Sequence, residues 1–369
     1  MKLTFNTDEL KGAVQVVIPA LSVKSENTSA KVYEFIQIST CEGAAILRCC
    51  NMKMQIETRI PAVIDEEGDL LLPGRLFSDV VARLPGTETS LESTDSTTAV
   101  IKSGAMNMKL QTLPSDEFEG LSSVSSESII RLEEGTLKKM ILQTAPFALQ
   151  DNTRPILKGI LVEVENGKLT MVAMEPLKFG MRKTDVEQLD CKAEIIVPSK
   201  LFESAARILD DSNDLVSLTF SSQSLTIATS NTTIILLKLD GTYIDYRSLM
   251  PQKYDTRVKL ARKDFIAVAE RAYLVARDDM KNCVKLVFDN DKISVMVENE
   301  IGSVNDSLNA YISGSGLTMH FNIKNFLEVV KNIEDEEIIF ELGRPKDPCV
   351  IKPVEGDSFF YIVLPIVVM

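Results

Sequence analysis

Histidine is almost missing from this sequence: His320 is the only one among 369 residues, and tryptophan does not occur. His320 lies in the strand-like segment MHFNI, where we expect a core or edge position rather than a catalytic one. A single imidazole leaves little basis for a zinc site or a His-based triad. The phosphate loop G-x-x-x-x-G-K-[ST] and the nucleophile elbow G-x-S-x-G are also absent. These absences favour a protein that is not an enzyme, and we expect no cofactor and no metal.

Long apolar runs are lacking as well. No stretch reaches about 20 uninterrupted apolar residues, so no membrane span is expected. The amino terminus is acidic within its first ten residues and has no long apolar core, which argues against a signal peptide. The six cysteines form no C-x-x-C pair. We predict a cytoplasmic protein with reduced structural thiols at Cys41, Cys49, Cys50, Cys191, Cys283 and Cys349.

Positive charge is scarce overall, since the formal net charge is -13. On a uniform surface this charge would argue against nucleic acid, because phosphate binding needs concentrated Lys and Arg. The acidic run at 334–337 could suggest a metal-dependent nuclease. Consecutive carboxylates do not converge on one ion without further ligands, so a solvated turn after a helix is the better interpretation.

What the sequence does contain is an internal repeat. Three segments share one pattern, and their phenylalanines lie 125 and 124 residues apart: PGRLFSDVVARL (73–84), PSKLFESAARIL (198–209) and NIKNFLEVVKNI (322–333). A second set is spaced by 127 and 128 residues at its last positions: KLTFNTDEL (2–10), IIRLEEGTL (129–137) and RVKLARKDF (257–265). Two independent marks with one period indicate three similar domains.

Each repeat has the same local form. A strand-like run such as DLLLP, EIIVP or MHFNI leads into a segment whose apolar residues recur every three or four positions, which predicts a helix. Runs of alternating polarity between these helices predict antiparallel hairpins. We therefore predict an α+β fold with six helices, two in each of three similar domains. The Ser-rich LSSVSSES and the turn-like MPQKYDT separate the predicted domains 1–122, 129–250 and 256–369.

The charge is unevenly distributed over these elements. Twelve Lys or Arg stand against seven Asp or Glu in the six helical segments, 8–21, 74–84, 135–149, 199–209, 262–276 and 323–333. If all the helices faced one concave surface, their cations could bind phosphates while the outside stayed acidic. The alternative is that these cations belong to the solvated faces of amphipathic helices.

Along its whole length the sequence resembles the bacterial DNA polymerase III beta subunit, the sliding clamp. The resemblance rests on MKLTFN at the start, LPSDEFEGL (113–121), TRPILKGILVEV (153–164), DGTYIDYRSLMP (240–251) and the closing YIVLP. It implies a head-to-tail dimeric ring whose helices line a central hole around duplex DNA and whose antiparallel sheets form the outside. Such a ring would contact the DNA backbone without reading its sequence. The implied partners are double-stranded DNA, the replicative DNA polymerase, the clamp loader, other clamp-motif proteins and a second copy of the chain, with no membrane.

The resemblance and the charge pattern together assign residues to three surfaces. The DNA-facing set is Lys11, Lys24, Arg75, Lys138, Lys139, Arg154, Lys200, Arg207, Lys324 and Lys331. The groove for partner peptides is Leu157, Met174, Pro176, Leu177, Phe179, Ile244, Leu249, Ile362, Leu364, Pro365 and Ile366. At the dimer interface, Met108 and Leu110 of the first domain are expected to meet Leu274 and Val275 of the other subunit's third domain.

The uncharged end YIVLPIVVM is interpreted as a strand beside this groove. In a regular strand Ile362, Leu364 and Ile366 would share one face, and Pro365 would mark the end of strand pairing. Where the family usually has Thr-Asp-x-His-Arg-Leu, this chain has Met-Glu-Pro-Leu-Lys-Phe at 174–179, so its peptide preference is expected to differ. We interpret the protein as a non-enzymatic processivity clamp. A divergent second clamp and an acidic peptide-binding scaffold that does not encircle DNA remain alternatives.

Overall fold

The computed structural model describes residues 1–22, 28–95, 97–121, 128–187, 192–251, 253–277 and 282–367. The chain forms two compact units. The first unit is Met1–Lys138 with Ser204–Lys238, and the second is Lys139–Glu203 with Leu239–Met369. The predicted middle domain is thus divided between the two units, for a reason that lies in the sheets.

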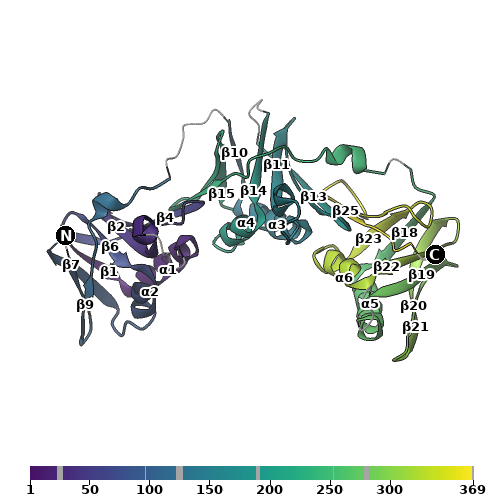
Figure 1. Ribbon diagram of the computed structural model, residues 1–369, viewed down its shortest axis with the longest axis horizontal. Coiled ribbons are helices and arrows are strands. Elements are labelled where there is room, and N and C mark those ends of the chain that lie inside the picture. Colours follow the sequence, from purple (N-terminus) through teal and green to yellow (C-terminus); the bar gives the residue numbers. More distant parts are fainter. Residues whose placement is uncertain are drawn as a thin grey trace. The chain divides into compact units, whose positions relative to one another are not determined.

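Two antiparallel sheets build the first unit (Figure 1). In spatial order, the five-stranded sheet holds β5 (Val63–Glu66), β1 (Lys2–Asn6), β7 (Glu88–Asp95), β8 (Thr98–Ser103) and β9 (Met106–Gln111). The eight-stranded sheet holds β10 (Ser128–Glu133), β15 (Leu215–Phe220), β16 (Ser224–Ala228), β17 (Thr232–Leu237), β4 (Met54–Pro61), β3 (Ala44–Cys50), β2 (Phe35–Cys41) and β6 (Asp69–Pro73).

A single twelve-stranded antiparallel sheet builds the second unit. Its spatial order is β14 (Ala193–Pro198), β11 (Gly159–Glu165), β12 (Lys168–Glu175), β13 (Lys178–Asp185), β25 (Phe359–Val363), β24 (Cys349–Pro353), β23 (Glu337–Leu342), β18 (Thr256–Ala261), β21 (Ser303–Gly314), β20 (Lys292–Glu298), β19 (Cys283–Asp289) and β22 (Leu317–Asn322).

Strands of neighbouring repeats pair directly, which explains why the units cut through the middle domain. β4 of the first repeat pairs with β17 of the second, from Thr58↔Thr232 to Met54↔Leu236. β13 of the second repeat pairs with β25 of the third, from Lys178↔Val363 to Arg182↔Phe359. The eight-stranded and twelve-stranded sheets therefore each continue across a repeat boundary, and the boundaries predicted from the sequence stay predictions.

Six α-helices lie in the described part of the chain, as predicted: α1 (Thr7–Val17), α2 (Gly74–Val81), α3 (Glu134–Thr144), α4 (Ser199–Ala206), α5 (Arg262–Ala276) and α6 (Ile323–Lys331). Short 3-10 turns lie between the longer elements: η1 (Ile18–Ala20), η2 (Thr28–Glu34), η3 (Ser115–Glu117), η4 (Ala145–Phe147), η5 (Pro155–Lys158) and η6 (Tyr246–Leu249). The repeat phenylalanines Phe77, Phe202 and Phe326 are all buried, as the helical periodicity requires.

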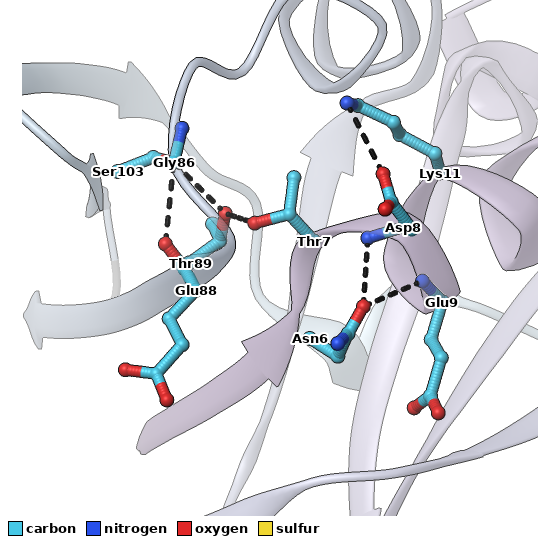
Figure 2. A network of polar contacts seen from close by, with 9 residues as sticks. All are labelled: Asn6, Thr7, Asp8, Glu9, Lys11, Gly86, Glu88, Thr89 and Ser103. Atoms are coloured by element: carbon cyan, nitrogen blue, oxygen red, sulfur yellow. Dashed lines mark hydrogen bonds and ion pairs between the residues drawn. The ribbon is translucent and has the colours of Figure 1, made fainter.

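Polar contacts fix the start of α1 (Figure 2). The Asn6 side chain accepts hydrogen bonds from the backbone N–H of Asp8 at 2.9 Å and of Glu9 at 3.2 Å, so it caps the helix. The buried hydroxyl of Thr7 lies 2.8 Å from that of Thr89 on β7 and ties the helix to the sheet. Asn322 caps α6 in the same way by accepting from the N–H of Asn325 at 3.1 Å.

The cysteines in the described part of the chain are free thiols, which agrees with the prediction of reduced cysteines. Cys49, Cys50 and Cys349 are buried, whereas Cys41 and Cys283 are half-buried. Cys191 lies outside the described residues. No described helix is long and apolar enough to cross a membrane.

Candidate functional site

An apolar pocket of about 560 Å³ lies in the second unit, next to the β13–β25 strand pair. Its wall is built from the turn between β12 and β13, from η5 and η6, and from the end of β25. It is lined by Arg154, Leu157, Met174, Glu175, Pro176, Lys178, Phe179, Ile244, Leu249, Pro348, Ile362 and Leu364. Segments more than 200 residues apart in sequence, such as η5 and β25, thus meet at one recess.

Eight of the predicted groove residues line this pocket: Leu157, Met174, Pro176, Phe179, Ile244, Leu249, Ile362 and Leu364. Leu157, Phe179 and Ile362 are buried and form its floor, while Ile244, Leu249 and Leu364 are exposed. Buried apolar side chains under exposed ones are the arrangement that an inserted apolar side chain could complete.

The other three predicted groove residues lie outside the lining. Leu177 is exposed, and its carbonyl accepts the N–H of Leu364 at 3.1 Å. Pro365 forms an isolated bridge with Phe321, and the N–H of Ile366 donates to the carbonyl of His320 at 2.7 Å. The reason is that β25 ends at Val363 and the chain then turns to β22, so the two-residue alternation expected for a continuing strand does not extend to Ile366.

Aromatic packing holds the pocket floor. The ring of Phe179 stacks on that of Tyr246 with centroids 5.9 Å apart and meets Phe360 edge-on at 6.2 Å. The Tyr246 hydroxyl donates to a carboxylate oxygen of Glu163 at 2.6 Å, and Arg247 contacts the same carboxylate at 3.2 Å. Burial, together with the hydrogen bond to Glu163, raises the pKa of Tyr246 well above its usual range. The phenol therefore stays a neutral donor.

A buried ion pair that the sequence did not predict lies at the edge of this pocket. Lys178 is only 6% exposed, and its ammonium lies 2.6 Å from Glu328 of α6 and 3.3 Å from Glu175. Two carboxylates compensate the burial of one cation. Lys178 thus fastens β13 of the second repeat to the α6 helix of the third.

The predicted DNA-facing cations differ in what they contact. Four of them form ion pairs: Lys11 with Asp8 at 3.5 Å, Lys138 with Asp211 at 3.1 Å, Lys139 with Glu334 at 3.1 Å and Lys331 with Glu270 at 2.6 Å.

Arg75 and Lys324 are exposed and form no ion pair with any residue that the structure describes. Lys200 and Arg207 are exposed at α4, with Arg207 directly after its end. Arg154 is not on a helix: it precedes η5 and lines the apolar pocket. Lys24 lies outside the described residues.

The residues predicted for the dimer interface belong to β9 and α5. Met108 is half-buried on β9, which forms one edge of the five-stranded sheet. Leu110 is already buried within its own domain, so it has little surface left for a partner. In the second unit Leu274 is 60% exposed on α5, and Val275 is half-buried. Leu274 is therefore the predicted interface residue with the most apolar surface to lose.

The acidic run at 334–337 takes part in ion pairs rather than in a carboxylate cluster. Glu334 pairs with Lys139, and Glu337 pairs with Lys259 at 2.7 Å. Among the residues that the structure describes, no three His, Cys, Asp or Glu side chains are grouped as a metal site. His320 is half-buried on β22, and its backbone carbonyl holds the chain end.

Comparisons with known proteins agree over the whole chain. Three family models match in order: the N-terminal domain of the DNA polymerase III beta subunit at 1–122, the central domain at 131–245 and the C-terminal domain at 247–367. The beta sliding clamp of Staphylococcus epidermidis is 28% identical over 376 residues, with 99% of each chain covered.

Solved structures are similar over the same length. The DNA polymerase sliding clamp of Bacillus subtilis has a TM-score of 0.95 at 27% identity, covering 100% of both chains. A putative DNA polymerase III beta subunit of Eubacterium rectale has a TM-score of 0.92 at 25% identity, covering 99% of both chains. The predicted arrangement of three similar domains with antiparallel sheets is confirmed.

Proposed function

Since the chain belongs to the family of DNA polymerase III beta subunits, the non-enzymatic sliding clamps, we propose that two copies close into a ring around duplex DNA and tether the replicative polymerase to it. The observation that carries this proposal is the apolar pocket, because eight residues assigned from the family resemblance line it together. The ring would act in the cytoplasm and would hold DNA by encircling it rather than by affinity.

The pocket is suited to the apolar end of a partner peptide. Its floor of Leu157, Phe179 and Ile362 offers no hydrogen-bonding side chain, and Arg154 supplies a positive charge at the wall. Peptides that dock in this way bind through a few apolar anchors in a preformed groove. We therefore propose that the clamp loader, the polymerase and other clamp-motif proteins compete for this pocket.

Ring closure is assigned to β9 of one subunit and α5 of the other. β9 pairs only with β8 among the described strands, so one edge of it is open for contact with a second copy. Leu274→Asp would place an unpaired carboxylate in a small apolar interface. Sedimentation should show dimers for the wild type and monomers for Leu274→Asp; a wild type that is monomeric at micromolar concentration contradicts the ring.

The contact with DNA is assigned first to Arg75 and Lys324, because the other helical cations named above are already engaged in ion pairs or contact other groups. Exchanging both for Gln should weaken DNA retention and lower the slope of log affinity against log salt by about 0.9 for each phosphate that is no longer neutralised. Lys331→Gln, which removes a cation paired with Glu270, serves as the matched control and should change retention less.

Primer extension on a long circular template, with polymerase and clamp loader, tests the whole proposal. The protein should lengthen the products made in a single binding event, and Leu274→Asp should abolish this effect. A scaffold that binds peptides without encircling DNA would keep peptide binding and leave product length unchanged. A divergent second clamp would support one polymerase and not another.

A further inference from the structure

The two junctions between repeats are fastened differently. At the junction of the second and third repeats, the Lys139–Glu334 ion pair is joined by a hydrogen bond from the Asn332 amide to the Gln143 carbonyl at 2.7 Å. The buried Lys178–Glu328 pair adds a third contact. We call these three side-chain contacts the latch.

The internal repeat shows which residues stand at the latch positions of the other junction. Spacings of 127 residues for α1 and α3, and of 124 residues for α4 and α6, relate corresponding positions. Gly12 then corresponds to Lys139 and Asp210 to Glu334, while Val16 corresponds to Gln143 and Ile208 to Asn332. Neither pair can form the ion pair or the hydrogen bond of its counterpart.

The third latch contact has no ionic counterpart at the corresponding described positions. Lys178 pairs with Val363 at one end of the β13–β25 register, and Met54 pairs with Leu236 at the same end of the β4–β17 register. By the 124-residue spacing, Glu328 corresponds to Ser204. A buried ion pair at one junction is thus replaced by Met and Ser at the other.

A hollow of about 820 Å³ occupies the place where these contacts would lie in the first unit. All four helix-side residues line it, Gly12, Val16, Ile208 and Asp210, and nothing lies within 4 Å of a Cβ built on Gly12. Glu9, Glu134 and Asp214 line the same hollow, and Arg59 is the one cation in its described lining, so carboxylates outnumber cations there. Asp211 is paired within its own repeat, with Lys138.

A backbone ladder between β4 and β17 joins the two repeats of the first unit. The hydroxyls of Thr58 and Thr232 lie 2.9 Å apart, and the N–H of Arg59 donates to the carbonyl of Asn231 at 2.8 Å. A strand pair resists separation of its strands but tolerates changes in twist. We propose that the chain bends at the junction of the first and second repeats, with the β4–β17 ladder as the hinge, while the latch keeps the junction of the second and third repeats stiff.

Single-molecule energy transfer within one subunit tests this hinge. Dyes are attached through unnatural amino acids at exposed positions, Glu67 and Ser222 in the first unit or Glu194 and Tyr311 in the second, and labelled chains are mixed with excess unlabelled protein. We expect a wider distance distribution for Glu67–Ser222, across the first junction, than for Glu194–Tyr311, across the second. Equal widths, or the reverse order, overturn the proposal.

Two sets of variants transfer or remove the latch. Gly12→Lys places a cation opposite Asp210 and should narrow the Glu67–Ser222 distance distribution. Gly12→Glu, the matched control, should not narrow it. Lys139→Ala with Asn332→Ala should widen the distance distribution across the second junction. Loss of the exposed ion pair should raise the population of bent chains there by up to about fivefold. Lys331→Ala breaks an ion pair within the third repeat only and should leave both widths unchanged.

Thermal unfolding of each variant verifies that it folds. If Gly12→Lys narrows the distribution no more than Gly12→Glu, or if the latch variants widen nothing, the hinge assignment is wrong. If the protein forms the proposed ring, the ring would bend at the junction of the first and second repeats when it opens; this consequence rests on the proposed function. The dyes report within one subunit, so the hinge result is independent of whether a ring forms.

Discussion

The apolar pocket and the hollow lie beside equivalent strand pairs, β13–β25 and β4–β17, yet their linings differ in kind. The pocket rests on aromatic rings, with Phe179 packed on Tyr246 and Phe360. The hollow is lined by Thr58, Asn231 and Thr232 together with several carboxylates, Arg59 and a smaller apolar part. The repeat geometry thus places a recess at each junction, and the side chains decide whether its lining is mainly apolar or rich in polar and charged groups.

Among the variants that test this comparison, Phe179→Ala, in the pocket floor, should have the largest effect on stability. The side chain is buried between two other aromatic rings, and removing it should cost about 3–5 kcal/mol of the free energy of unfolding. Urea denaturation followed by circular dichroism measures this loss, and Phe179→Leu should lose less. A cost below about 1 kcal/mol would show that the pocket floor is not packed as described.

Lys178→Met makes the junction of the second and third repeats resemble that of the first and second. Met54 occupies on β4 the position that Lys178 occupies on β13. Lys178→Met keeps the apolar stem but leaves Glu328 and Glu175 without their cation. Because Glu328 is 42% exposed, water screens part of the loss, and we expect about 1–3 kcal/mol of destabilisation. Urea denaturation measures this loss, and Lys178→Ala should lose more stability than Lys178→Met; the opposite order would mean that packing of the stem contributes nothing.

The chain end offers a test that leaves the fold intact. Leu364→Ala removes an exposed pocket residue and should weaken binding of a polymerase-tail peptide by about 2 kcal/mol, roughly thirtyfold. Ile366→Ala keeps the backbone hydrogen bond to His320 and should leave the affinity within about twofold. Fluorescence anisotropy with the same peptide compares the two. An Ile366 variant that binds as weakly as the Leu364 variant would show that Ile366 contributes to the peptide site, as predicted from the sequence.

The sequence was sufficient where a feature is local or repeated. Helical periodicity placed the six helices and the buried Phe77, Phe202 and Phe326, because a buried face forces apolar residues to recur. The groove could be assigned only through the family resemblance. Eight of the assigned residues line one pocket because they lie on or beside regular strands and turns.

Other features depend on contacts between distant segments. Lys178 and Glu328 are 150 residues apart, and no pattern in the sequence joins them. The position of Ile366 depends on where β25 ends and on the bridge to β22, neither of which alternation alone reveals. Leu110 was assigned to the dimer interface through the family resemblance, and the packing that buries it within its own domain is not visible in the sequence.

The smallest expected effect concerns the strand that receives the chain end. Burial, with Lys285 nearby as a second cause, lowers the pKa of His320 below its ordinary value of 6.5. The unfolded chain then binds a proton more readily than the folded one, so the contribution of His320 to stability is fully present above pH 6.5 and is lost as the pH falls through the lower folded pKa. His320→Gln cannot titrate. The quantity to compare is the midpoint temperature of thermal unfolding of the wild type minus that of His320→Gln. This difference should be constant from pH 7 to 8 and should decrease as the pH is lowered below 6.5. A difference that increases on acidification would mean that the folded protein favours the charged imidazole.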